Sequence, residues 1–266
     1  MSALASPVAD ERGALREFVA YHQDAYFTIA YGLTDEQARS TPSASAMSIG
    51  GVIKHATGVQ QTWMRRVAAA PDAPPADSRS FEERAAAFQD EFVMRDDQTL
   101  EQILDAFAAQ NAETLRLIDA ADLDASVPVP TDAPWFPKDV KHWSVRWVIH
   151  HLINELARHS GQADVIRESI DGATMYELVA GLEGWPETDW LKPWRPRRLV
   201  ARIVAQSRAR TYPALEGETV TPEARVVTIV TSATPVTPEG GTRSARLAAT
   251  IPPSAPRRAH DGPGER

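Results

Sequence analysis

The chain has 266 residues, of which 43% are hydrophobic, and its net charge is −8. This size allows a substantial core in one or two domains, and the acidic balance argues against a nucleic-acid partner. No apolar run approaches the roughly 18 residues that a membrane span needs, so no membrane association is expected. The N-terminus, MSALASPVADERG, lacks the features of a signal peptide. The chain has no cysteine, which excludes disulfides, and these features together favour a cytoplasmic protein.

The composition changes sharply near residue 196. All seven Trp and all seven Phe precede this point, and the only aromatic residue after it is Tyr212. Residues 197–266 hold 11 Arg, 6 Asp or Glu and eight of the 20 prolines, so their charge is +5 against −13 for the first 196 residues. The sequence therefore predicts a folded domain over residues 1–196 and a Pro/Arg/Thr-rich, low-complexity, disordered tail over residues 197–266.

Three long amphipathic helices are expected in the first 122 residues. The first spans about 10–31, and the second spans about 49–69 behind the N-cap residue Ser48. The third follows the capping box Thr99–Gln102 and runs to about residue 121, while a second capping box at Ser80–Glu83 opens a short helix. The apolar residues at helical spacing are Leu15, Phe18, Val19, Ala25, Tyr26, Ile29, Val52, Ala56, Val59, Trp63, Val67, Leu100, Ile103, Leu104, Phe107, Leu115 and Ile118.

A fourth long helix is expected behind Ser144, ending at Gly172. Arg146 and Asp164 fall on the side of its helical wheel that should face water. The following residues, 173–196, are expected to wrap the bundle and close one end. Four long amphipathic helices without alternating strands predict an all-α, four-helix-bundle fold.

Two polar residues of this fourth helix lie on its apolar face. At about 100° per residue, Glu155 and His159 fall within the arc that contains Val148 and Leu152. A buried carboxylate without a partner costs several kcal/mol, on the order of the desolvation of a charge. Glu155 is therefore expected to be paired, protonated or bound to a metal ion.

The spacing of Glu155 and His159 suits a metal site. They are one helical turn apart, as are the two ligands that a single helix supplies in the HExxH motif. His55, at the edge of the apolar stripe of the second helix, is the candidate third ligand. Two His and one carboxylate hold zinc or non-haem iron with a coordination position open. Two other interpretations remain: a Glu–His ion pair that only packs, and a His151–Glu155 pair with His159 as an accessory base.

At these residues the sequence resembles the DinB superfamily and, within it, the DUF664 branch. The segments that carry the resemblance are WSVRWVIHHLINELARHSGQADVIRESIDG, YELVAGLEGWPETDWLKPW and SIGGVIKHATGVQQTWMRRV. The resemblance covers residues 10–196 and implies a DinB-like four-helix bundle. In the superfamily the fourth helix often reads HxxxH before a Gly-Gln pair; here Glu155 takes the first His position and His159 the second. The resemblance thus implies that His55, Glu155 and His159 bind zinc, or another divalent metal such as iron or nickel, as in the mycothiol-dependent branch that includes maleylpyruvate isomerase.

The function that this resemblance implies is thiol S-transfer. Relatives use mycothiol or another low-molecular-weight thiol as a cosubstrate, so the expected partners are a small thiol and an electrophile. Metal coordination deprotonates a thiol, which fits a chain without cysteine. The isomerase relatives carry a folded C-terminal domain that residues 197–266 do not resemble, which favours a transferase over an isomerase. Helical bundles of this type commonly form homodimers.

Two other functions remain open on the sequence. The bundle could be a metal-dependent hydrolase that uses metal-bound hydroxide. It could also be a non-catalytic stress-response protein in which the metal is a structural clip. A structural site is closed by four protein ligands, and His22, on the apolar stripe of the first helix, or His151 would be the fourth.

Overall fold

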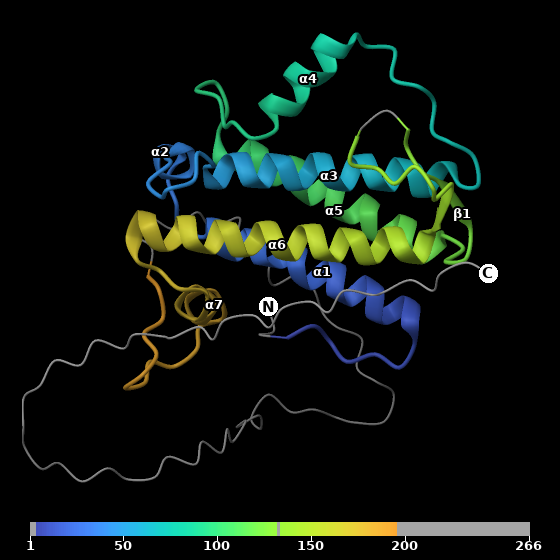
Figure 1. The fold of residues 1–266 in the computed structure, drawn as a ribbon. Helices are drawn as coiled ribbons and strands as arrows, with labels where there is room; N and C mark the ends of the chain where they lie inside the picture. Colours follow the sequence, from blue (N-terminus) through green and yellow to red (C-terminus); the bar gives the residue numbers. More distant parts are fainter. Residues whose placement is uncertain (1–3, 132–133, 196–266) are drawn as a thin grey trace, which may run out of the picture. The chain divides into compact units, whose positions relative to one another are not determined.

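Four long helices build the framework of this chain, for which a computed structural model describes residues 4–131 and 134–195. They are α1 (Glu11–Ala30), α3 (Ile49–Ala69), α5 (Leu100–Ala120) and α6 (Val145–Asp171). Helix α1 packs against α5 and α6, and α3 packs against the same two helices. The four helices thus close around one core, as Figure 1 shows. The predicted all-α four-helix bundle is confirmed, while the predicted tail lies outside the described residues.

The predicted helix starts are also confirmed. The Ser48 hydroxyl accepts a hydrogen bond from the Gly51 N–H, and the Ser144 hydroxyl accepts one from the Trp147 N–H. Both predicted capping boxes form, in front of α4 (Phe81–Asp90) and in front of α5. These side chains satisfy N–H groups that have no partner within their own helix.

In the described part of the chain, four further small elements accompany the long helices, and the two strands and the last helix among them were not foreseen. Helix α2 spans Asp35–Arg39, and β1 (Ser126–Pro128) pairs with β2 (His142–Ser144) as a short antiparallel ladder just before α6. Helix α7 (Met175–Glu183) lies in the segment that was expected to wrap the bundle, and it packs against α1. A nine-residue helix and three-residue strands are too short for periodicity to reveal.

Two predicted orientations are wrong. Phe18 of α1 is half exposed, because the core side of this helix is centred on Val19 and Tyr26 and Phe18 points about 100° away from it. Asp164 of α6 does not face water: it lines a small cavity together with residues of α1 and α7, and so it is partly buried. The unpredicted α7 is the reason, since it covers a side of α6 that a four-helix bundle would leave open.

No helix within the described residues combines the length and apolarity that a membrane crossing requires. Helix α4 differs from the others because none of its residues is buried. In Figure 1 it stands off the bundle on the side of α3. Its C-terminal end is nevertheless important, because the residues that follow it reach back over α3.

Candidate active site

Three polar side chains follow one another along α6. His151 Nε2 lies 3.5 Å from Glu155 Oε1, and His159 Nε2 lies 3.5 Å from Glu155 Oε2. Side chains four residues apart on a helix are neighbours on one face, which explains the row. All three are partly buried. One carboxylate is therefore held between two imidazoles, both of which can donate to it or share a metal with it.

The third predicted ligand lies opposite this row. His55 of α3 is only 7% exposed, and its ring centroid lies 4.7 Å from that of His159, nearly perpendicular to it. The structure thus brings His55, Glu155 and His159 together from two helices, as predicted. Within the described residues, however, no three His or acidic side chains are placed as a ready metal-binding group. The donor types fit a metal ion, and metal binding stays a prediction.

A second carboxylate, which the sequence analysis did not identify, contacts His55. Glu91 Oε2 lies 3.3 Å from His55 Nδ1, and the ring of Phe92 stacks on the imidazole at 4.3 Å between centroids. Glu91 can lie there because Gly58 has no side chain: a Cβ at Gly58 would be 2.5–2.7 Å from the Glu91 carboxyl group. Glu91 follows a helix that has no buried residue, so no sequence periodicity pointed to it.

The remaining ring nitrogen of His159 is also held. His159 Nδ1 lies 2.7 Å from Gln162 Oε1, the amide of the Gly-Gln pair noted in the sequence. When Nδ1 donates its N–H to Gln162, Nε2 is the nitrogen that faces Glu155: in the protonated ring it donates to the carboxylate, and in the neutral ring its lone pair is available to a metal. Polar partners of this kind orient the histidines of metal sites. Together, five side chains form a polar cluster: His55, Glu91, His151, Glu155 and His159.

The charges within the polar cluster influence one another. The interaction with His159 lowers the pKa of Glu155 below its ordinary value, although burial opposes this, and the interaction with Glu155 raises the pKa of His159. Burial lowers the pKa of His151, and Glu155 opposes that effect only in part. Glu155 is therefore ionised and His151 neutral at neutral pH, so a carboxylate and an uncharged base stand side by side.

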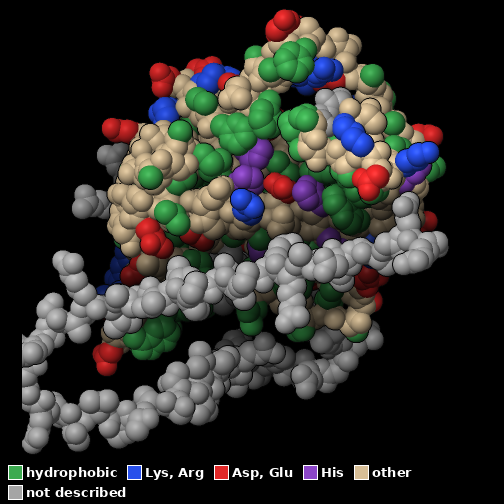
Figure 2. Space-filling view, in the orientation of Figure 1, with side chains coloured by type: hydrophobic (Ala, Val, Ile, Leu, Met, Phe, Trp, Pro, Cys, Tyr) green, Lys and Arg blue, Asp and Glu red, His purple; other side chains and the backbone are tan. Residues whose placement is uncertain are grey.

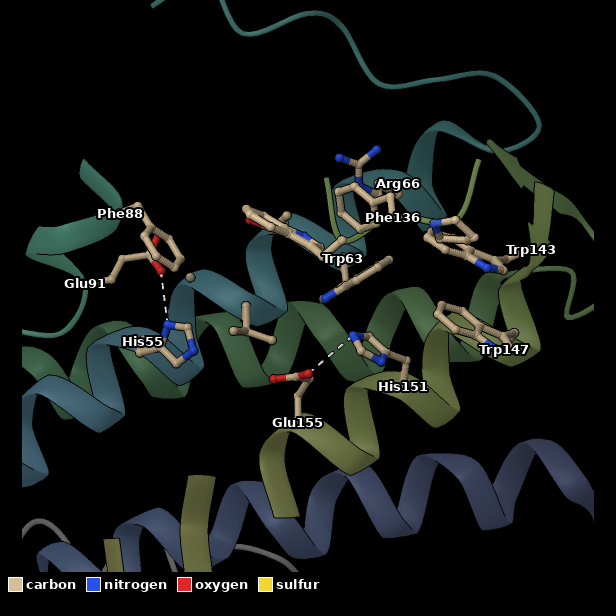
Figure 3. Close-up of a pocket in the computed structure, with 15 residues that line it drawn as sticks. His55, Trp63, Arg66, Phe88, Glu91, Phe136, Trp143, Trp147, His151 and Glu155 are labelled. Carbon is tan, nitrogen blue, oxygen red and sulfur yellow. Dashed lines mark hydrogen bonds and ion pairs between the residues drawn. The ribbon is translucent and has the colours of Figure 1, made fainter. Parts of the chain in front are cut away.

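A cavity of about 590 Å³ opens beside the polar cluster. Its polar end is formed by His55, Glu91, His151 and Glu155. Its other end carries Arg66 and an aromatic wall formed by Trp63, Phe136, Trp143 and Trp147. Figure 3 shows the two ends following one another along α3 and α6, and in Figure 2 histidine and acidic side chains surface in a hollow flanked by hydrophobic groups. The volume and the mixed lining are those of a small-molecule site.

The aromatic wall continues the row on α6. Trp143 and Trp147 stack at 4.3 Å with planes 9° apart, and Trp147 and His151 stack at 5.2 Å with planes 6° apart. Trp63 of α3 closes against the side of this column, 4.6 Å from His151. Residues 143, 147, 151, 155 and 159 thus form one line at four-residue spacing. This spacing is visible in the sequence, and it was the available signal for Trp143 and Trp147, which the sequence analysis did not connect with His151, Glu155 and His159.

His22 does not belong to this site. It lines the cavity of about 190 Å³ that also contains Asp164, on another side of α6. Burial lowers the pKa of His22 and raises the pKa of Asp164 to about 6. The proposal of His22 as a fourth metal ligand is therefore not supported by its position.

Comparison with known proteins gives a family for most of the bundle. Residues 14–172 match the family model described as Mycothiol-S-transferase, a DinB-like family. No curated protein matches the chain significantly. A solved structure titled "Crystal structure of the conserved protein of locus from Enterococcus faecalis" aligns with a TM-score of 0.41 and 19% identity, over 62% of this chain and 100% of its own.

Proposed function

Because the chain belongs to the mycothiol-S-transferase family, we propose that it is a metal-dependent thiol S-transferase that joins mycothiol, or a similar small thiol, to an electrophile. The observation that carries the proposal is the meeting of His55, Glu155 and His159, of which His55 and Glu155 line one end of a cavity of about 590 Å³. A metal used only as a structural clip would have no need of a cavity beside it.

The partners of the two histidines support the proposed ligand set. Glu91 occupies Nδ1 of His55, and Gln162 occupies Nδ1 of His159. Each imidazole would therefore offer Nε2 to a metal, and the Glu155 carboxylate would be the third ligand. A metal such as zinc, when bound, supplies an open coordination position and favours the thiolate form of a thiol. Since Glu155 raises the pKa of His159, metal binding would release a proton from this side chain.

His151 has a separate role in the proposal. It is neutral at neutral pH because burial lowers its pKa, and it borders the cavity one helical turn from Glu155. We assign it as the group that accepts the proton of the incoming thiol. The sulfur then forms a bond to the electrophilic carbon, which either releases a leaving group with its electron pair or passes the electron pair of its double bond to the neighbouring atom. The proton passes from His151 to that leaving group, to the product or to water. The aromatic wall keeps water away from the reacting atoms at the other end of the cavity.

The experiment that tests this function combines metal analysis with an activity assay. Mass spectrometry of the purified full-length chain should find about one metal ion per chain, and Glu155→Ala and His159→Ala should both lose it. Transfer of mycothiol to monobromobimane should follow the metal content and should be restored by zinc in the wild type. His151→Ala should keep the metal but lose most of the transfer rate. A wild type that binds no metal even with added zinc would refute the proposal.

A further inference from the structure

We propose that the aromatic wall binds the electrophile, that this electrophile is a planar aromatic compound with a conjugated carbonyl group, and that the indole N–H of Trp63 donates a hydrogen bond to its carbonyl oxygen. The inference deepens the proposed thiol S-transfer and rests on it for the reaction, although the binding site itself does not. It assigns a substrate-binding role to the aromatic wall, which the proposed metal ligands do not use.

The first observation is a set of hydrogen-bond donors without acceptors. Among the residues that the structure describes, the indole N–H groups of Trp63, Trp143 and Trp147 make no hydrogen bond to another group of the protein. Trp63 is only 9% exposed, yet it lines the cavity. Its Nε1 is not among the fully enclosed side-chain nitrogens that lack a partner, so this N–H is accessible from the cavity. An indole N–H in a largely enclosed site normally finds an acceptor. A bound ligand with an acceptor oxygen would supply the hydrogen-bond acceptor that the protein does not supply.

The second observation is the direction of this donor. Trp63 lies 4.6 Å from His151 between ring centroids, where the aromatic wall meets the polar cluster. Figure 3 shows the nitrogen of Trp63 at the end of the ring that faces His151 and Glu155. An oxygen held by Trp63 would therefore lie beside the proposed thiol position. The reacting carbon of the ligand would be close to the sulfur.

The third observation is the shape and character of the lining. Trp143 and Trp147 form a stacked column, and Trp147 remains 41% exposed along its side. Phe136 packs on Trp143 with its ring at 60° and narrows the space above the column. Such walls favour a flat aromatic body over a branched one. The cavity of about 590 Å³ can hold a one- or two-ring molecule with room left for a thiol.

These features suit conjugate addition. The thiolate sulfur bonds to the β carbon of the ligand, and the electron pair of the carbon–carbon double bond moves to the carbonyl oxygen. The Trp63 N–H stabilises the negative charge on that oxygen, where the charge develops. The resulting enolate takes up, at its α carbon, the proton that the thiol released, and the carbonyl is restored. All atoms of the thiol and the electrophile are then in one thioether, and no further reactant is needed.

The test uses the indole N–H signals of the 15N-labelled full-length chain, which contains seven Trp. The probe is 1-indanone, an aromatic ketone without a reactive double bond, and its control is indane, which has the same ring system without the oxygen. Trp63→Phe identifies the Trp63 signal and keeps an aromatic ring at this position. Trp190→Phe is the matched control, because Trp190 is exposed and lies outside the cavity lining.

We expect 1-indanone to move the Trp63 indole proton saturably downfield and indane to leave it near its original position. Trp63→Phe should bind 1-indanone about threefold to tenfold more weakly, the value of one hydrogen bond, and Trp190→Phe should bind it normally. An unmoved Trp63 signal, or an equal response to the two compounds, would overturn the inference. So would an equal downfield shift with mycothiol alone, because the acceptor would then belong to the thiol.

The measurement is made without thiol and in the presence of a chelator, so it does not depend on the transfer reaction. If the Trp63 signal responds to 1-indanone while no transfer can be detected, the binding site stands and the proposed function fails. If mycothiol is transferred while the Trp63 signal stays unmoved, the proposed function stands and this inference fails. The signals of Trp185 and Trp194, which lie outside the cavity lining, should stay unchanged and report that each variant is folded.

Discussion

Helix α6 borders two cavities that each contain a histidine and a carboxylate. On one side, Glu155 lies between His151 and His159, and each of these contacts changes the pKa of the carboxylate. On the other side, burial is the main cause of the pKa shifts of His22 and Asp164, and within the described residues neither makes a hydrogen bond or an ion pair. A half-buried titratable group is therefore not in itself a site. Mutual contact and an adjoining cavity distinguish the polar cluster.

The strongest test of this comparison removes the same charge on both sides of α6. Glu155→Gln should lower thiol transfer by about 100-fold or more and remove the metal, because an amide is a much poorer metal ligand than a carboxylate. Asp164→Asn, the same chemical change in the other cavity, should leave both unchanged. Metal analysis and initial rates on the two purified variants decide the matter. Equal losses in the two variants would mean that α6 as a whole was disturbed.

A second test changes the support of the polar cluster without touching a proposed ligand. Gly58→Ala places a methyl group where the Glu91 carboxyl group packs, so Glu91 should leave His55. We expect metal affinity to fall by about 10- to 100-fold, as when other orienting partners are lost. Gly161→Ala is the control, because its added Cβ meets nothing within 4 Å. Competition with a metal-binding dye measures both affinities, and an unaltered affinity in Gly58→Ala would show that Glu91 does not orient His55.

In the cavity that contains His22 and Asp164, we expect a substitution to change the stability of the protein and not its activity. In the unfolded chain Asp164 should ionise near its ordinary pKa of 3.8, whereas burial raises its pKa to about 6 in the fold. Between these values the folded state keeps a proton that the unfolded state has released, so the free energy of unfolding falls as the pH rises. Asp164→Asn should stabilise the protein by about 1 kcal/mol at pH 7, after allowance for partial exposure, and by little at pH 4. Urea unfolding at the two pH values measures the difference.

The smallest expected effect concerns the Glu155–His159 pair in the metal-free protein. His159 has a raised pKa, so its contribution to stability is complete below its ordinary pKa of 6.5 and is lost as the pH rises through the raised value. Glu155 has a lowered pKa, so its contribution is present above its ordinary value of 4.5 and is lost as the pH falls through the lowered one. The destabilisation caused by His159→Ala should therefore be largest between about pH 4.5 and 6.5. A pH-independent difference in thermal unfolding would contradict the pairing.

The sequence was sufficient to predict the four-helix framework because short-range sequence signals mark where helices begin. Capping boxes at Ser80 and Thr99 and N-caps at Ser48 and Ser144 mark their starts, and these short-range signals depend on a few neighbouring residues. The predicted meeting of His55 with the α6 row also followed from helix faces. These are the parts of the fold that local chemistry determines.

What the sequence did not predict depends on contacts between distant segments. Glu91 reaches His55 across 36 positions and only because Gly58 leaves room. Asp164 was expected to be solvent-exposed, since no pattern within α6 indicates that α7 covers this side chain. The column of Trp143 and Trp147 had a spacing signal, but its function as a cavity wall requires Trp63 from another helix.

The fully buried Arg167 gives the segment after α6 an unexpected importance. Its guanidinium donates to the carbonyl oxygens of Ile29 and Tyr31 at the end of α1, pairs with Asp171, and is covered by the indole of Trp194 at 5.4 Å. The backbone N–H of Trp194 in turn donates to the Glu177 carbonyl of α7. The family match ends at residue 172, but the contacts that keep Arg167 buried extend to Trp194. A protein shortened to the matched residues would keep the hydrogen bonds of Arg167 to the end of α1 but would lose the indole that covers its guanidinium, so the border of the family match is not the border of the packed structure.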